Sequence, residues 1–251
     1  MSVVQETFLS HLIELRGRLV RAVGTVLAVF ALLSFWAGDI YDILAQPMLQ
    51  TLPAGTRMIA TGVVTPFFVP IKVTLMVAFV LCLPVVLYQA WAFVAPGLYA
   101  HEKRLALPLV LGSTVLFLLG MAFCYFIVFG WVFKFIAEFA PTSINLAPDI
   151  EEYLSFVMTM FLAFGLTFEV PVVVVMLTRI GIVDIDALKK GRPYVVVGAF
   201  VVAAVITPPD VISQFMLALP MWLLYELGIV IARTVTPQAK DVAASGAGDE
   251  A

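Results

Sequence analysis

The sequence predicts an all-α, polytopic membrane protein with six transmembrane helices, of which the fifth and sixth are short, and with both termini cytoplasmic. Three observations support this prediction. Hydrophobic residues make up 63% of the 251 residues and charged residues only 12%, with a mean hydropathy of +1.08. The apolar residues gather in six long runs, and most Lys and Arg residues fall on alternate connections between them. No soluble domain of this length buries so much apolar surface.

The six apolar runs are expected to be the spans, since a transmembrane helix needs about 20 apolar residues. Arginines precede the first run as in a secretory signal, but Glu14 lies before it and no small-residue cleavage site follows, so we expect this run to be retained. The expected bounds are Leu19 to Trp36, Val73 to Val94, Leu105 to Phe133, Tyr153 to Leu177, Pro193 to Thr207 and Ile212 to Ala232.

The fifth run, from Pro193 to Thr207, is too short for an undistorted bilayer. At 1.5 Å per residue it reaches about 22 Å, against a hydrocarbon thickness of about 30 Å. Pro208 and Pro209 follow it and cannot continue a helix. We therefore expect the last two runs to form a short helical hairpin with local bilayer thinning, and a re-entrant pair is the alternative.

The distribution of basic residues predicts the orientation. Of the 14 Lys and Arg residues, only Arg57, Lys72 and Lys134 lie on the side opposite the termini. The other eleven lie in the N-terminal segment, the second and fourth connections and the C-terminal tail. By the positive-inside rule, both termini are expected to be cytoplasmic.

The expected organisation has three parts: a cytoplasmic amphipathic segment over residues 1–18, a six-span membrane domain over 19–233, and a disordered cytoplasmic tail over 234–251. Two long external connections, 37–70 and 135–152, are expected to form short amphipathic helices over the outer face. Cys82 and Cys124 lie within spans and are interpreted as small buried hydrophobic residues. No metal-ligand cluster and no cofactor motif is found, so neither a metal nor a cofactor is expected.

Two acidic residues are candidates at the cytoplasmic side. Apolar residues at helical spacing predict an interfacial helix before the first span, and Glu14 lies on another face of it, where pairing with Arg18 at i+4 is the simpler interpretation. Glu102 lies in the second connection at the head of the third span. There a carboxylate also suits the positive end of the helix dipole, so capping is the alternative.

Polar residues inside the spans form a second group of candidates. Glu169 lies well within the fourth span, where an ionised carboxylate costs about 3 kcal/mol or more. Pro171 frees the carbonyl of Thr167, which predicts a polar, kinked notch; structural hydrogen bonding is the alternative role for Glu169. Thr207 and Gln214 flank the external turn of the hairpin and are expected to offer hydrogen bonds to a partner helix. Glu226 is a weaker candidate because it lies near the cytoplasmic interface.

Several motifs together resemble the TatC subunit of the twin-arginine protein translocase. The resemblance extends from about Ser10 to Arg233. The matching segments are His11-Leu12-Ile13-Glu14-Leu15-Arg16, Phe93-Val94-Ala95-Pro96-Gly97-Leu98-Tyr99 with Glu102-Lys103-Arg104, Phe168-Glu169-Val170-Pro171, Arg192-Pro193-Tyr194, and Thr207-Pro208-Pro209-Asp210 with Ser213-Gln214.

The resemblance implies a receptor and not an enzyme. Proteins of this family bind twin-arginine signal peptides and, with single-span TatA and TatB partners, export folded proteins across the bacterial cytoplasmic (inner) membrane using the protonmotive force. Glu14 and Glu102, with Arg16 and Phe93, would then receive the signal peptide. Pro47, Tyr125, Glu169, Asp210 and Gln214 also match positions that matter in the family. Self-association is expected; nucleic-acid binding is not.

Two other classes fit parts of the pattern. A secondary transporter would also place an acid in the membrane, but the halves of the chain share no similarity and no paired broken helices. An intramembrane protease needs catalytic residues within the spans, whereas His11 and His101 lie at the cytoplasmic edge, and neither Gly-x-Ser-x-Gly nor His-Glu-x-x-His occurs. The residues alone favour neither a transporter nor a receptor. The motif series favours the receptor.

Overall fold

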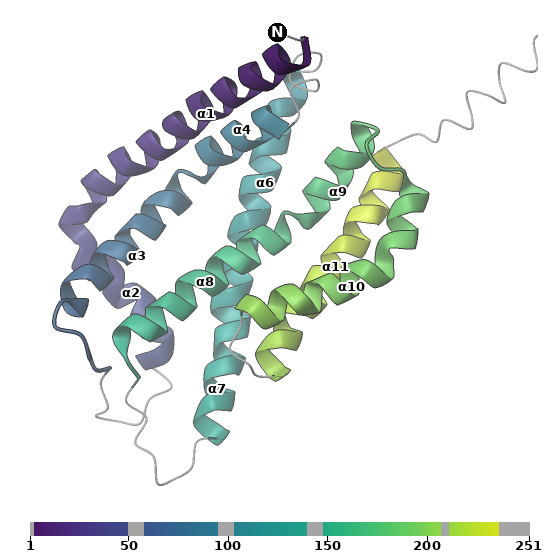
Figure 1. Cartoon of the computed structure of the whole chain (residues 1–251). Helices are drawn as coiled ribbons and strands as arrows, with labels where there is room; N and C mark the ends of the chain where they lie inside the picture. The colour runs from purple at the N-terminus through teal and green to yellow at the C-terminus, as the bar shows by residue number, and fades with distance from the viewer. Residues whose placement is uncertain (1–2, 50–57, 95–102, 140–147, 207–210, 236–251) are drawn as a thin grey trace, which may run out of the picture. The chain divides into compact units, whose positions relative to one another are not determined.

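The computed structural model describes residues 3–49, 58–94, 103–139, 148–206 and 211–235, and every regular element in these ranges is helical. The chain divides into two compact units, Met1–Gly165 and Leu166–Ala251, which are described separately (Figure 1). The expected tail lies outside the described residues from residue 236 onward. The boundaries expected at residues 18 and 233 stay predictions.

The first unit begins with a long helix that continues from the N-terminal segment into the first apolar run. Helix α1 spans Val3–Leu33, a 3-10 turn η1 spans Ser34–Trp36, and α2 spans Ala37–Leu49. The expected amphipathic segment and the first span therefore share one helix. The short helix expected in the first external connection is present as α2.

The second apolar run is bent, although it was expected to be one span. Helix α3 covers Thr65–Leu81 and α4 covers Leu83–Val94, and the two meet at Cys82 with a bend of 62°. Pro84 has no backbone N–H, so the carbonyl of Val80 lacks its usual helical donor. The Cys82 thiol donates to the carbonyl of Thr25 on α1, with Sγ and O 3.7 Å apart. Figure 1 shows α1 beside both halves of the bent pair.

The third apolar run is one long helix with an irregular segment. It consists of α6 (Lys103–Phe123), a π-helical segment η2 (Cys124–Val128) and α7 (Phe129–Phe139). The Trp91 indole donates to the Ser113 hydroxyl at 2.9 Å, which fixes α4 against α6. Helix α7 extends into the second external connection, so no separate short helix precedes residue 140; residues 140–147 lie outside the described part.

The fourth run is interrupted where the sequence predicted a notch. Helix α8 spans Ile150–Phe168, α9 spans Val170–Arg179, and Glu169 lies between them. Pro171 supplies no N–H to the Thr167 carbonyl, and the backbone N–H of Glu169 bonds to the nearer Leu166 carbonyl at 3.1 Å. The predicted interruption is confirmed. Within the first unit, α8 packs on α7 through aromatic rings such as Phe129 and Phe161, whose centroids are 5.3 Å apart.

The second unit consists of α9, α10 (Ile185–Ile206) and α11 (Val211–Val235), with α11 packed against both others (Figure 1). Its core contains Val174, Leu188, Tyr225, Ile229 and Ala232. Gly181 ends α9 in the left-handed region, with φ at 78°, where a residue with a Cβ is strained. The last two runs form the α10–α11 pair, as predicted, but the two helices have 22 and 25 residues, so the prediction that both are short is wrong for the helices themselves.

Two segments expected outside the membrane are tied together in the first unit. Ile59 and Asp149 form an isolated parallel bridge. One Asp149 carboxylate oxygen accepts from the Thr61 amide and hydroxyl, and the other accepts from the amides of Glu151 and Glu152. These hydrogen bonds lower the pKa of Asp149 from 3.8 to about 2, the Thr61 hydroxyl being the largest cause. The carboxylate therefore caps α8 and holds the residue 58–65 segment against its N-terminus.

Four stretches in the described ranges are long and apolar enough to cross a membrane, and the bent α3–α4 pair adds a fifth when its two helices are counted as one span. The four are His11–Gln46, Leu107–Phe135, Ile150–Arg179 and Val211–Thr234. Helix α10 does not qualify, because its first turns carry Asp186, Lys189, Lys190 and Arg192 and leave only a short apolar run. The short apolar part of α10 agrees with the short fifth span expected from the sequence, whereas the sixth span, also expected to be short, is long enough in α11 to cross a membrane. The count of six spans stays a prediction.

Candidate functional site

The acidic candidate on α1 is exposed and already carries a partner. Glu14 accepts from the Arg18 guanidinium, with Nε 2.9 Å from Oε1. This is the i+4 pair that the sequence offered as the simpler interpretation. An exposed pair of this kind stabilises a helix by only about 0.3–0.5 kcal/mol, so an incoming cation can displace Arg18 at little cost. Arg16 is also exposed on the same helix.

A stacked ring pair brings α1 to the end of α4. The rings of His11 and Phe93 lie 4.3 Å apart at an interplanar angle of 19°. Because His11 precedes Glu14 by three positions on α1, the two side chains lie on neighbouring parts of one helical face. Phe93 stands at the last turn of α4, just before the segment that contains Glu102. Glu102 itself lies outside the described residues.

Glu169 occupies the interruption between α8 and α9. Its side chain is buried, with 6% of its surface exposed. Its backbone carbonyl accepts from Val173 at 2.9 Å, which starts α9. A buried carboxyl group at a break in a membrane helix is costly unless its surroundings compensate it, which is why such groups mark functional positions more often than structural ones.

Gln214 ties the two helices of the hairpin together. Its amide nitrogen donates to the Phe200 carbonyl on α10 at 3.1 Å, and the Phe200 and Phe215 rings meet edge to face at 5.0 Å. The side-chain NH2 group of Gln214 thus already has a hydrogen-bond acceptor within the chain. Thr207 and Asp210 lie outside the described residues.

The remaining candidates lie in three other places. Tyr125 is in the π-helical segment, with its ring 6.3 Å from that of Phe161. Pro47 belongs to α2. Glu226 pairs with Arg192 across the α10–α11 hairpin at 2.7 Å, which supports its low rank as a candidate. π-Helical segments are frequent at functional sites. The position of Tyr125 in such a segment therefore supports it as a candidate, and this could not be seen in the sequence.

Sequence reasoning missed an apolar groove in the first unit and the ion pair at its end. The groove has a volume of about 670 Å³ and is lined from α1, α3, α4 and α8. Lys72 on α3 bonds Glu151 on α8 at 2.6 Å, and the Thr65 hydroxyl donates to the other oxygen of Glu151 at 3.0 Å. The spacing of the lining residues along each helix was visible in the sequence, but the convergence of the helices was not. Within the described ranges, no three His, Cys, Asp or Glu side chains gather as metal ligands would.

Comparisons with known proteins all point to the same family. Residues 10–220 match the family described as Sec-independent protein translocase protein (TatC). The chain belongs to this family. The TatC protein of Azotobacter chroococcum mcd 1 is 51% identical over 94% of this chain and 93% of its own length, and that of Escherichia coli K12 is 51% identical over 91% and 88%.

A solved structure agrees with the fold. The crystal structure of a twin-arginine translocase receptor TatC superposes with a TM-score of 0.79 at 38% identity, covering 90% of this chain and all of that one. The expected resemblance is confirmed. As a family member the chain is a multi-pass membrane protein and a component of a Sec-independent protein translocase, which is a transport function and not a catalytic one.

Proposed function

We propose that this chain is the receptor subunit that binds twin-arginine signal peptides and nucleates a complex with TatA-like and TatB-like single-span proteins. The complex would export folded proteins across the bacterial inner membrane using the protonmotive force. The observation that best supports a receptor is the stacked His11–Phe93 pair, because it brings Glu14 on α1 near the end of α4. Glu102 follows a few residues later in the sequence.

The chemistry of this surface suits paired guanidinium groups. Carboxylates accept two parallel hydrogen bonds from one arginine, and such charge-assisted bonds are about twice as strong as neutral ones. Two carboxylates, Glu14 and Glu102, would each take one arginine of the signal. Arg16 and Phe93 complete the surface as positioning residues. Lysine makes no fork-shaped bonds, so the surface is expected to discriminate against paired lysines.

The polar residues inside the membrane are assigned to partner helices and not to the arginine pair. Glu169 is buried at a helix break, and Gln214 lies in the hairpin. With Thr207, they would hydrogen-bond partner spans, and such bonds are modest, about 0.6 to 2 kcal/mol each. Glu169→Ala is therefore expected to weaken disulfide crosslinks from nearby cysteines to a TatB-like helix while precursor binding persists. Loss of precursor binding first would reverse this assignment.

The receptor proposal is tested by site-specific photocrosslinking from position 102. A twin-arginine precursor should crosslink, and the same precursor with paired lysines should crosslink far less. Glu14→Gln or Glu102→Gln should weaken precursor binding by about tenfold, the effect of losing one charge-assisted hydrogen bond. Glu6→Gln, on the same helix, is the matched control. If Glu102→Gln binds as tightly as the parent, helix capping is the better account of Glu102.

A further inference from the structure

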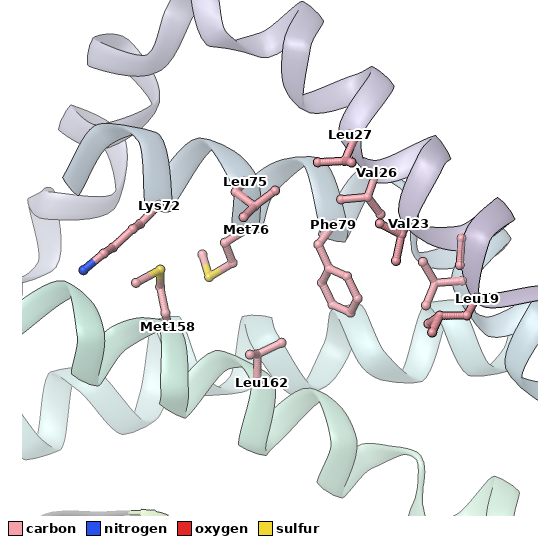
Figure 2. A pocket seen from close by; sticks show the side chains of 12 residues that line it. Leu19, Val23, Val26, Leu27, Lys72, Leu75, Met76, Phe79, Met158 and Leu162 are labelled. Carbon is pink, nitrogen blue, oxygen red and sulfur yellow. The ribbon is translucent and has the colours of Figure 1, made fainter. Parts of the chain in front are cut away.

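The groove in the first unit is apolar along its length and charged at one end. Figure 2 shows the Lys72 amino group at one end and Leu19 at the other, with only apolar side chains between them. The lining residues from α1 are Leu19, Ala22, Val23, Val26 and Leu27; those from α3, α4 and α8 are Lys72, Leu75, Met76, Phe79, Val86, Met158 and Leu162. The polar part of the lining is confined to Lys72.

Most of the lining comes from regular faces of α1, α3 and α8, and Val86 of α4 completes it. On α3, Lys72, Leu75 and Phe79 follow the three- and four-residue spacing of one face. On α8, Glu151, Met158 and Leu162 are separated by seven and four residues, which again places them on one face. Helices α1 and α8 belong to membrane-spanning candidates and α3 to the bent candidate pair, so we expect the groove to face the lipid phase. An apolar molecule of the bilayer is therefore its natural occupant.

The charged end of the groove carries one positive and one negative side chain. The Lys72–Glu151 pair is about half exposed, with 46% and 44% of the two side chains accessible. Glu151 lies at the start of its candidate span, where lipid headgroups are found. The Lys72 ammonium has three donors, so it can bind a phosphate while keeping Glu151, and Glu151 can accept a further ammonium. A headgroup with a phosphate and an amine complements this pair, whereas a purely anionic headgroup meets a repelling carboxylate.

The lining of the groove is uneven, because side chains of very different size, from Ala22 to Phe79, contribute to it. A flexible acyl chain fills a narrow volume of this kind without leaving lining atoms uncontacted.

We propose that this groove binds one acyl chain of a zwitterionic, amine-bearing glycerophospholipid, with its phosphate at Lys72 and its ammonium at Glu151. The binding site is distinct from the signal-peptide surface and from the intramembrane polar residues. Bound lipid would fill the space between α1, α3 and α8 and hold these three helices at a fixed spacing.

The test uses the purified full-length chain and native mass spectrometry. Phosphatidylethanolamine and phosphatidylglycerol with identical acyl chains are titrated in parallel, and retained adducts are compared. Phosphatidylethanolamine should bind more tightly to the parent. Lys72→Met should weaken its binding by about tenfold, the value of one charge-assisted hydrogen bond, while Lys134→Met, a lysine on α7, should leave it unchanged. Equal binding of the two lipids would overturn the headgroup assignment.

A second pair of variants tests the groove itself. Ala22→Phe places a ring in the groove and should abolish the phosphatidylethanolamine preference, whereas Ala28→Phe, an exposed position on the same helix outside the lining, should keep it. A phosphatidylethanolamine with a photoreactive acyl chain, used on the unmodified chain in nanodiscs, should label peptides that contain Met76 or Leu162. Labelling elsewhere, or displacement of the lipid by a second copy or by a single-span partner, would contradict the proposal.

Discussion

At the scale of single residues, close packing leaves specific positions no spare volume. A Cβ placed on Gly165 of α8 would lie 2.3 Å from the Phe117 ring, and Phe117 is fully buried. By contrast, a Cβ on Gly112 of α6 meets nothing within 4 Å. The two glycines therefore allow opposite predictions from the same substitution.

Gly165→Ala is expected to lower the free energy of unfolding by about 1 to 3 kcal/mol, because the Phe117 ring must shift in a packed core. Gly112→Ala is the control and should stabilise the chain by about 0.5 to 1 kcal/mol, since alanine favours a helix. Unfolding in mixed micelles with increasing denaturing detergent measures both. Equal effects at the two positions would contradict the packing described for α6 and α8.

Asp149 allows a prediction, also at the residue scale, of how the stability of the fold depends on pH. Its folded pKa of about 2 is below the unfolded value of 3.8, so the ionised form stabilises the fold. This contribution is complete above the unfolded value and is lost as the pH falls from about 4 to about 2. The stability difference between the parent and Asp149→Ala should therefore be constant above pH 5 and shrink below pH 4.

The measurement is the unfolding midpoint in detergent at each pH. A difference that persists undiminished at pH 2 would mean that the hydrogen bonds from Thr61 and the α8 amides do not depend on the charge of this carboxylate.

At the scale of elements, prolines decide where apolar runs break. The sequence predicted the interruption after Phe168 because Pro171 follows a buried acid, and it missed the 62° bend at Cys82 although Pro84 was visible. A proline in the first turn of a helix is compatible with a straight or a bent junction. The structure adds contacts that the sequence does not show: α1 contacts both halves of the bent pair, and the Cys82 thiol donates to the Thr25 carbonyl.

Pro84→Ala restores a backbone donor for the Val80 carbonyl and is expected to reduce the bend between α3 and α4. Labels on noncanonical side chains at the exposed positions Phe67 and Val94 should then move apart in pulsed electron spin resonance. Pro66→Ala is the control, because a proline in the first turn of α3 removes no helical bond. An unchanged distance in Pro84→Ala would assign the bend to packing alone.

At the scale of the whole molecule, the sequence predicted the class and the helical composition well, because hydropathy accumulates over many residues. It predicted the contact between α1 and α4 only through the family resemblance. No periodicity relates His11 to Phe93, since residues distant in sequence meet only after the helices pack. The groove escaped prediction for the same reason: each of its lining faces resembles an ordinary buried stripe until three of them converge.

Orientation is the remaining prediction at this scale. With the two native cysteines replaced, single cysteines at Ala54 and Thr142 should react with an impermeant reagent applied outside intact cells, and one at Ala187 should not. The reason is the excess of basic residues in the connection that contains Ala187. Labelling at Ala187 alone would contradict both the predicted topology and the count of six spans.

The π-helical segment has a consequence for how the third apolar run tolerates insertions and deletions. A π-segment holds one more residue than the α-helix it interrupts, so all positions after it are rotated by about 100° around the axis. Phe129 and Phe133 reach Phe156 on α8 from positions directly after this segment. Deleting one residue among 124–128 would therefore remove the extra residue and leave the aromatic stripe of α7 facing α8, whereas turning the segment into regular α-helix without a deletion would rotate the stripe by about 100° away from α8. A single extra residue thus sets the direction in which the side chains after this segment point around the helix axis.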